Sequence, residues 1–236
     1  MAQPTGDDER WERLIDVAAE FGLRHPDAVL IGGTVAALYA GHRVSLDADF
    51  VLTDLRERFE QLLSALESDP DWVTARLKPP VLILGHFKGV ETGLRQLRRS
   101  GPLETTEISV RGQRLRVPTL SEILRIKGWL AVSRNATRDY LDLAALSVRA
   151  GLPAAAQALA ELDRCYRDVY RVDAQRDVSV ALQLARQLAE PTPYDLDQTD
   201  LPSYKRLEPR WHDWAAVCGQ LRELAVALTE ALTQDG

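Results

Sequence analysis

The stretch DAVLIGGTVAALYAGHRVSLDADFVL, residues 27–52, carries the pattern that decides the fold. A short apolar run over 27–31 stops at two glycines and is typical of a buried strand. The segment 34–40 is rich in alanine and leucine and predicts a short helix that Gly41 ends. Acidic and apolar side chains then alternate over 47–52, which is the period of a second strand. The stretch therefore predicts strand, tight glycine turn, helix and strand in succession.

The glycine turn, Gly32-Gly33, is a candidate phosphate-binding site. Glycines let the backbone bend sharply and leave room for a ligand close to the main chain. The free N–H groups and the dipole of the helix that follows favour a phosphate, to which the Thr34 hydroxyl could also donate. The same turn could equally be a tight connection that binds nothing.

Asp47 and Asp49 are the candidate metal ligands. They stand two residues apart on a predicted strand, so both side chains lie on one face while Ala48 and Phe50 point into the core. Two carboxylates at this spacing suit Mg²⁺, which binds one or two carboxylates together with substrate phosphates. The alternative is the wet face of an edge strand without a metal. A third acid nearby, Asp54, is expected to cap the following helix.

The chain changes character near Pro118. Before this point the pattern predicts helices over 8–21, ended by Gly22, and 55–66, and strands over 72–77, 81–87, 104–110 and 113–117, the last two joined in a hairpin by Arg111-Gly112. After it only helices are expected, over 118–132 with a Thr119/Glu122 capping box, 135–149, 154–162, 178–189 and 211–232. We therefore predict an α+β fold, with mixed strands and helices over 1–117 and a helical part over 118–236.

The glycine turn and the aspartates occur together as Gly32-Gly33-Thr34 followed by Arg43-x-Ser45-x-Asp47-x-Asp49. This pattern resembles the nucleotidyltransferases of the DNA polymerase β superfamily, and most of all the AbiEii/AbiGii-type toxin nucleotidyltransferases. The resemblance implies a polymerase β-like core, a magnesium ion held by the two aspartates, and contacts to the nucleotide from Gly32, Gly33, Thr34, Arg43 and Ser45.

A second stretch supports the resemblance, which covers about half of the chain. Lys127 stands on one predicted helix, and the run Arg138-Asp139-Tyr140-Leu141-Asp142 lies on the next, as in the later motif of those toxins. The resemblance implies that Lys127 and Arg138 contact the nucleotide and that Asp139 or Asp142 assists the chemistry. Alternatively, Arg138 and Asp142 form a plain ion pair one helical turn apart, and Lys127 is a surface lysine.

The superfamily usually places a third acid on a later strand, facing the first two. Glu107 is the candidate in this chain, and Glu104 is the alternative. They are three residues apart and face opposite sides of a strand, so only one of them can serve.

The charge of the chain is unevenly distributed. The net charge is −6, yet eleven Lys or Arg stand against four Glu between Lys88 and Arg138. A basic middle in an acidic chain favours a phosphate-bearing substrate, although a solvated surface would look the same. Neither a signal peptide nor an apolar run of membrane-spanning length is visible, so we expect a cytoplasmic protein without a membrane partner. The two cysteines lack metal-site spacing.

These observations predict a magnesium-dependent nucleotidyltransferase that moves an NMP from an NTP to a hydroxyl acceptor. By resemblance the acceptor is an RNA (tRNA) end or a protein side chain, and the chain is the toxin of a type IV toxin–antitoxin system with a cognate antitoxin as partner. The alternative is a non-catalytic module of the same fold that binds a nucleotide or a partner protein. The position of Glu107 or Glu104 relative to the aspartates distinguishes the two, since an incomplete set of acids would favour the module.

Overall fold

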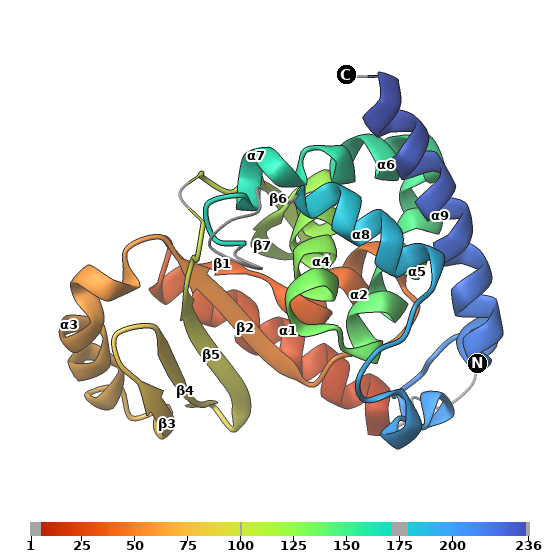
Figure 1. The fold of residues 1–236 in the computed structure, drawn as a ribbon. Coiled ribbons are helices and arrows are strands. Elements are labelled where there is room, and N and C mark those ends of the chain that lie inside the picture. Colours follow the sequence, from red (N-terminus) through yellow and green to blue (C-terminus); the bar gives the residue numbers. More distant parts are fainter. Residues whose placement is uncertain (1–5, 100, 171–178, 235–236) are drawn as a thin grey trace. The chain divides into compact units, whose positions relative to one another are not determined.

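The computed structural model describes residues 6–99, 101–170 and 179–234, and in it the chain divides into two compact units (Figure 1). The sheet unit comprises Met1–Val35, Val44–Arg98 and Pro102–Pro118. The helical unit comprises Ala36–Arg43, Arg99–Gly101 and Thr119–Gly236. The last boundary between the two units falls between Pro118 and Thr119, and the helical unit also takes in two short segments from earlier in the chain.

A mixed five-stranded sheet forms the centre of the sheet unit, in the order β1-β2-β5-β4-β3 (Figure 1). Its strands are β1 (Val29–Leu30), β2 (Asp47–Leu52), β3 (Trp72–Lys78), β4 (Leu82–Phe87) and β5 (Val90–Gln96). Strands β2 and β5 run parallel, and every other neighbouring pair is antiparallel. The parallel pair brings the aspartate strand beside a strand that lies more than forty residues later in the chain.

Aromatic packing buries one face of this sheet against α1 (Gly6–Arg24). The Phe21 ring lies 4.9 Å from the Phe50 ring and 5.3 Å from the Phe87 ring, measured between centroids. Trp72 of β3 adds a fourth ring to the cluster, at 6.1 Å from Phe21. The helix α3 (Leu55–Glu67) also packs against β3 and β5. Because side chains alternate along a strand, burial of this face leaves Asp47 and Asp49 on the other.

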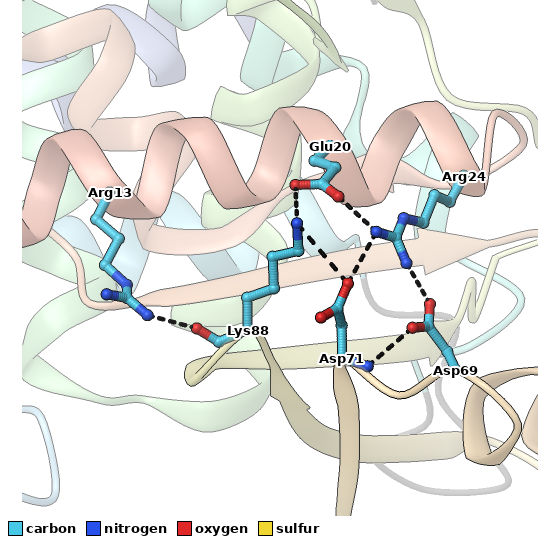
Figure 2. A network of polar contacts seen from close by, with 6 residues as sticks. All are labelled: Arg13, Glu20, Arg24, Asp69, Asp71 and Lys88. Carbon is cyan, nitrogen blue, oxygen red and sulfur yellow. Dashed lines mark hydrogen bonds and ion pairs between the residues drawn. The ribbon is translucent and has the colours of Figure 1, made fainter.

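A polar network holds the end of α1 to the turns beside the sheet (Figure 2). Arg24 binds Asp69 at 2.5 Å and Asp71 at 2.9 Å, while Lys88 binds Glu20 at 2.7 Å. Arg13 donates to the Lys88 carbonyl oxygen at 2.7 Å. The cationic groups in this region are therefore matched by carboxylates or backbone oxygens of the same unit.

The expected hairpin is confirmed as a separate two-stranded sheet, formed by β6 (Thr105–Val110) and β7 (Gln113–Pro118). Both turn residues adopt positive φ, 54° at Arg111 and 79° at Gly112, as a two-residue hairpin turn requires. β7 packs against α1 and β1.

The helical unit is built from α4 (Leu120–Arg134), α5 (Thr137–Ala150), α6 (Leu152–Ala160), α7 (Leu162–Tyr166), α8 (Val180–Ala189) and α9 (Trp214–Gln234). Close packing of α4 requires Gly128, because a Cβ there would lie 2.7 Å from Leu159 Cδ2 and 3.0 Å from Leu184 Cδ2. The unit thus confirms the expectation of helices after Pro118. None of the described helices is long and apolar enough to cross a membrane.

Several predicted element ends were wrong. Helix α1 continues through Gly22 to Arg24, which is tied to Glu20 on the preceding turn. Helix α2 (Gly32–Ala40) begins at the first glycine rather than at Thr34. Trp211 lies in the short 3-10 turn Pro209–Trp211, and α9 begins only at Trp214.

The N-terminal caps were predicted only in part. Thr119 caps α4 as expected, since its side chain accepts from the Glu122 N–H. Asp54 occupies the N-cap position of α3 but makes no capping bond, because its carboxylate pairs with Arg58 instead. The first residue of the helix expected over 178–189 lies outside the described residues, and the helix itself begins at Val180.

Candidate active site

The two aspartates of β2 lie on the face of the sheet that α1 leaves open. Ala48 and Phe50 are buried, whereas the Asp49 side chain is 23% exposed. On the parallel neighbour β5, Glu91 is in register with Asp47 and Gly93 with Asp49. Partners in a parallel ladder point to the same side, so Asp47, Asp49, Glu91, Gly93 and Arg95 share this surface, which we call the open face.

Each aspartate is held by a neighbouring donor. Ser45 Oγ donates to Asp47 Oδ1 at 2.5 Å, and Arg95 Nε donates to Asp49 Oδ1 at 3.1 Å. The Thr34 hydroxyl donates to the backbone oxygen of Asp47 at 2.6 Å. Ser45 and Thr34 therefore fix the position of Asp47. The Thr34 hydroxyl, which we expected to donate to a phosphate, donates instead to the backbone of Asp47.

Two glycines keep space open around Asp49. A Cβ at Gly93 would lie 2.7 Å from Asp49 Oδ1, and a Cβ at Gly32 would lie 3.6 Å from Asp49 Oδ2. Gly32 also has a φ of +81°, which side-chain-bearing residues rarely adopt. The first turn of α2 thus approaches the Asp49 carboxylate closely. The N–H groups in the first turn of a helix have no partners within the helix. This arrangement places a helix N-terminus beside an acidic pair.

The donor set fits a magnesium ion that is shared with a substrate. Among the described residues, no group of three or more His, Cys, Asp or Glu could hold a metal by itself. Mg²⁺ seldom needs such a cage, because it is usually held by one or two carboxylates, by water and by substrate phosphates. Asp47 and Asp49, with the helix N-terminus beside them, are groups of the kinds that such a set requires.

Gly93→Ala is expected to weaken Mn²⁺ binding by about tenfold while lowering stability by no more than about 1 kcal/mol. The atoms nearest to the new methyl group would be those of the Asp49 carboxylate and the tip of Leu84, which are the far ends of flexible side chains. Titration of Mn²⁺, followed by electron paramagnetic resonance, measures the first effect and thermal melting the second. The matched control is Gly22→Ala, whose Cβ would have no neighbour within 4 Å. Unchanged affinity in Gly93→Ala would show that the Asp49 position is not needed for the metal.

Glu107 and Glu104 do not complete a three-acid group. Glu107 lies on β6, in the separate hairpin sheet, with its side chain 67% exposed and 3.9 Å from Arg114. Glu104 lies outside β6, which begins at Thr105, so the expected strand placement was wrong for this residue. No described cluster of three acids includes either of them. The hairpin pairs with itself rather than with β2, which is why a strand position did not bring Glu107 to the aspartates.

Glu91 is an acid of the open face that the sequence pattern did not single out, although among the described residues it completes no metal-binding group of three. It stands next to Asp47 on the open face and is exposed. Its strand, Val-Glu-Thr-Gly-Leu-Arg-Gln, contains Gly93, whose lack of a side chain leaves room for the Asp49 carboxylate. Gly93 could have indicated that this strand lies beside the aspartates, but only if the pairing of β5 with β2 had been known.

A second cluster of predicted site residues lies within the helical unit, around Asp142 of α5. Asp142 Oδ1 accepts from Arg43 Nε at 2.9 Å and from His42 Nε2 at 2.8 Å. Lys127 Nζ of α4 lies 2.6 Å from Asp142 Oδ2. The Asp142 side chain is fully buried, and those of Lys127 and Arg43 are 3% and 8% exposed.

The cluster continues to Asp139, a second buried carboxylate that shares Lys127 with Asp142. Arg134 Nη2 donates to Asp139 Oδ1 at 2.8 Å, and Lys127 Nζ lies 3.5 Å from the same oxygen. Arg138, by contrast, is exposed and is not among the ion-pair partners of Asp142, so the pair that helical spacing suggested is not formed. We call the set His42, Arg43, Lys127, Arg134, Asp139 and Asp142 the Asp142 cluster.

The electrostatics of the cluster hold Asp142 in its charged form. Burial would raise the pKa of the Asp142 carboxyl. The positive charges of Arg43 and Lys127 and the hydrogen bond with His42 outweigh burial and hold this pKa well below its usual value. Lys127 is accordingly neither a surface lysine nor open to solvent; it neutralises buried carboxylates of its own unit.

Comparison with known proteins by sequence gives partial matches. No protein-family model matches the chain. It is 36% identical over 144 residues to the mycolic acid-containing lipids exporter MmpL11 of Mycolicibacterium smegmatis, and 37% identical over 134 residues to the heme uptake protein MmpL11 of Mycobacterium tuberculosis. These matches cover 59% and 56% of this chain but only 14% and 13% of the two relatives. The chain therefore spans a small part of the curated relatives that it matches.

Comparison by structure covers almost the whole chain. The nucleotidyltransferase toxin MenT4 from Mycobacterium tuberculosis superposes with a TM-score of 0.60 at 17% identity, over 96% of this chain and 86% of that one. A candidate nucleotidyltransferase from Helicobacter pylori gives 0.53 at 16% identity over 99% of both chains. JHP933 from the same organism gives 0.52 at 17% identity, over 99% of this chain and 96% of that one. The α+β prediction is confirmed: the chain has the fold of nucleotidyltransferases, a mixed-sheet core followed by a helical part.

Proposed function

We propose that this chain is a magnesium-dependent nucleotidyltransferase that moves an NMP from an NTP to a hydroxyl acceptor and releases pyrophosphate. The observation that carries the proposal is the aspartate pair of β2 on the open face, next to the N-terminus of α2. In a nucleotidyltransferase fold this arrangement joins two metal-binding carboxylates to a phosphate-binding turn.

Asp47 and Asp49 would hold Mg²⁺, which when bound supplies positive charge to the triphosphate and to the oxygens around the α-phosphorus. Ser45 and Thr34 fix Asp47 through its side chain and its backbone, so they act as positioning residues. Gly32 and Gly33 offer the N–H groups of the first turn of α2 to phosphate oxygens.

Arg95 adds a solvent-accessible positive charge to the same face. Its side chain is 43% exposed although its Nε already pairs with Asp49. A guanidinium has five N–H donors, so the remaining ones can pair with a phosphate without leaving the aspartate. Arg95 thus replaces Thr34 as the side chain that we assign to phosphate contact beside the glycine turn.

In this proposal the Asp142 cluster has a structural role and does not contact the nucleotide. The nucleotide contacts that the resemblance implies for Arg43 and Lys127 would require both to leave a buried carboxylate, which is unfavourable. We therefore assign Arg43, Lys127, Asp139 and Asp142 to holding the segment at His42-Arg43, which precedes Asp47 by a few residues in the chain. Arg138, which is exposed, keeps the proposed contact to substrate.

The biological setting that we propose is a toxin with a cognate antitoxin. It rests on the resemblance to AbiEii/AbiGii-type toxins and on the fold shared with MenT4, whose name describes a nucleotidyltransferase toxin. The proposed acceptor is an RNA end, with a protein hydroxyl as the other candidate.

The test is incubation of the purified protein with each α-³²P-labelled NTP, Mg²⁺ and total tRNA, beside the Asp47→Ala/Asp49→Ala variant. We expect label on a macromolecule in the wild type only, with one NTP preferred. Label at equal levels in both proteins would assign the activity to a contaminant. No label with any NTP, while a fluorescent NTP still binds, would overturn the transferase and favour the non-catalytic module.

A further inference from the structure

The open face continues beyond the aspartates onto β4 and β3. In the antiparallel ladders, Leu84 of β4 is in register with Gly93 and with Arg76 of β3, and Leu82 is in register with Arg95 and with Lys78. Partners in register share one face. One row across the sheet therefore reads Asp49, Gly93, Leu84, Arg76, and the next row ends at Lys78.

Charge is segregated along these rows. The acids Asp47, Asp49 and Glu91 lie on β2 and at the start of β5, whereas Arg95, Arg76 and Lys78 lie toward the end of β5 and on the edge strand β3. Between them, Gly93 and Leu84 form a low apolar floor without a charge. From β2 to β3 there are three strand spacings, or about 14 Å.

The basic residues of β3 differ from most of the other cations named so far, because no described carboxylate of the protein pairs with them. Arg76 and Lys78 are exposed, and neither has an ion-pair partner within 6–99, 101–170 and 179–234. By contrast, Arg24 at the end of α1 and Lys88 beside that helix are each neutralised by carboxylates in the network of Figure 2. Exposed cations next to a candidate phosphoryl-transfer site, left without internal partners, are available to an external anion.

We infer that the β4–β3 part of the open face binds the sugar–phosphate backbone of a nucleic-acid acceptor. This inference rests on the proposed function and assigns a binding surface to its nucleic-acid acceptor. The reacting hydroxyl would lie at the aspartates, and the phosphates a few nucleotides away would reach Arg76 and Lys78 across the floor of Gly93 and Leu84. Arginine and lysine pair with phosphate oxygens without reading base sequence.

A polyanion suits this surface better than a protein acceptor does. A folded protein would need an apolar patch or matched charges, whereas the only large apolar side chain that the described residues expose on this part of the face is Val73. Two unpaired cations at the far end of a flat strip match repeated phosphates. His86, exposed and in register with Glu91, adds a ring on which a base could stack.

The experiment compares wild type with Arg76→Ala/Lys78→Ala and with the control Arg10→Ala/Arg114→Ala. The control removes the same charge from two positions that are 68% and 77% exposed elsewhere in the sheet unit. Binding of total tRNA is measured by anisotropy over a series of salt concentrations. In the same preparations, binding of a fluorescent NTP and transfer of α-³²P label to RNA are recorded.

We expect Arg76→Ala/Lys78→Ala to weaken tRNA binding by about tenfold and to lower the slope of log affinity against log salt by about 2. NTP binding should not change, and the control should behave as wild type. Equal tRNA affinity in all three proteins would overturn the inference, and so would label transfer by wild type to protein alone. If wild type transfers no label but binds tRNA with the expected dependence on Arg76 and Lys78, the surface stands and the transferase fails.

Discussion

Asp49→Asn is expected to lower the rate of nucleotide transfer by about a thousandfold. The substitution keeps the shape of the side chain and removes one of the two negative charges that would hold Mg²⁺. Asp49 lies beside Gly32, Gly93 and Arg95, so the asparagine amide fits the same space. The loss should therefore appear in chemistry and metal binding, with little change in thermal stability.

The measurement is single-turnover transfer of α-³²P label at saturating NTP, with Mn²⁺ affinity determined in parallel. Glu107→Gln is the matched control. Glu107 is 67% exposed on the hairpin, and among the described residues it forms no acidic cluster that could hold a metal. We expect the control to retain full activity. Loss of activity in Glu107→Gln but not in Asp49→Asn would reverse the assignment of the metal site.

Asp142→Asn is expected to destabilise the helical unit by about 3–5 kcal/mol, which lowers its melting temperature by about 10 °C. A neutral amide would leave the charges of Arg43 and Lys127 buried without their main counter-ion. Asp197→Asn serves as control, since Asp197 is exposed in the same unit. Thermal melting by circular dichroism compares the variants, and equal melting temperatures would show that the cluster does not hold the unit together.

The same carboxylate gives this stability a defined pH dependence. Because the folded-state pKa of Asp142 lies below its unfolded value, its contribution is fully present above about pH 4, the unfolded pKa. The contribution is lost as the pH falls from there toward the folded-state pKa. The difference in melting temperature between wild type and Asp142→Asn should therefore shrink below about pH 4 and stay constant above it.

Local patterns predicted the parts of the fold that depend on neighbouring residues. The alternation over Asp47 to Leu52 placed both aspartates on one face of a strand, and Arg111-Gly112 predicted the hairpin turn. The change to helices near Pro118 was also readable, because helical periodicity needs only a few turns of sequence.

Pairings across long separations could not be read in this way. Glu91 joins the open face only through the pairing of β5 with β2, and Arg43 meets Asp142 across 99 residues. Lys127 was chosen by resemblance, yet its charge is taken up by Asp142 and Asp139. Spacing alone does not show whether a cation faces a substrate or a buried carboxylate.

The short segment Ala36–Arg43 belongs to the helical unit although it lies far from Thr119 in the chain. As a result, the chain before Pro118 and the chain after it cannot be exchanged independently between related proteins. A recombination event at Pro118 would give the helical part a new N-terminal half and would separate Asp142 from His42 and Arg43. A viable chimaera would have to inherit both segments together, so we expect the residues at 42, 43, 127 and 142 to change in concert among descendants rather than one at a time.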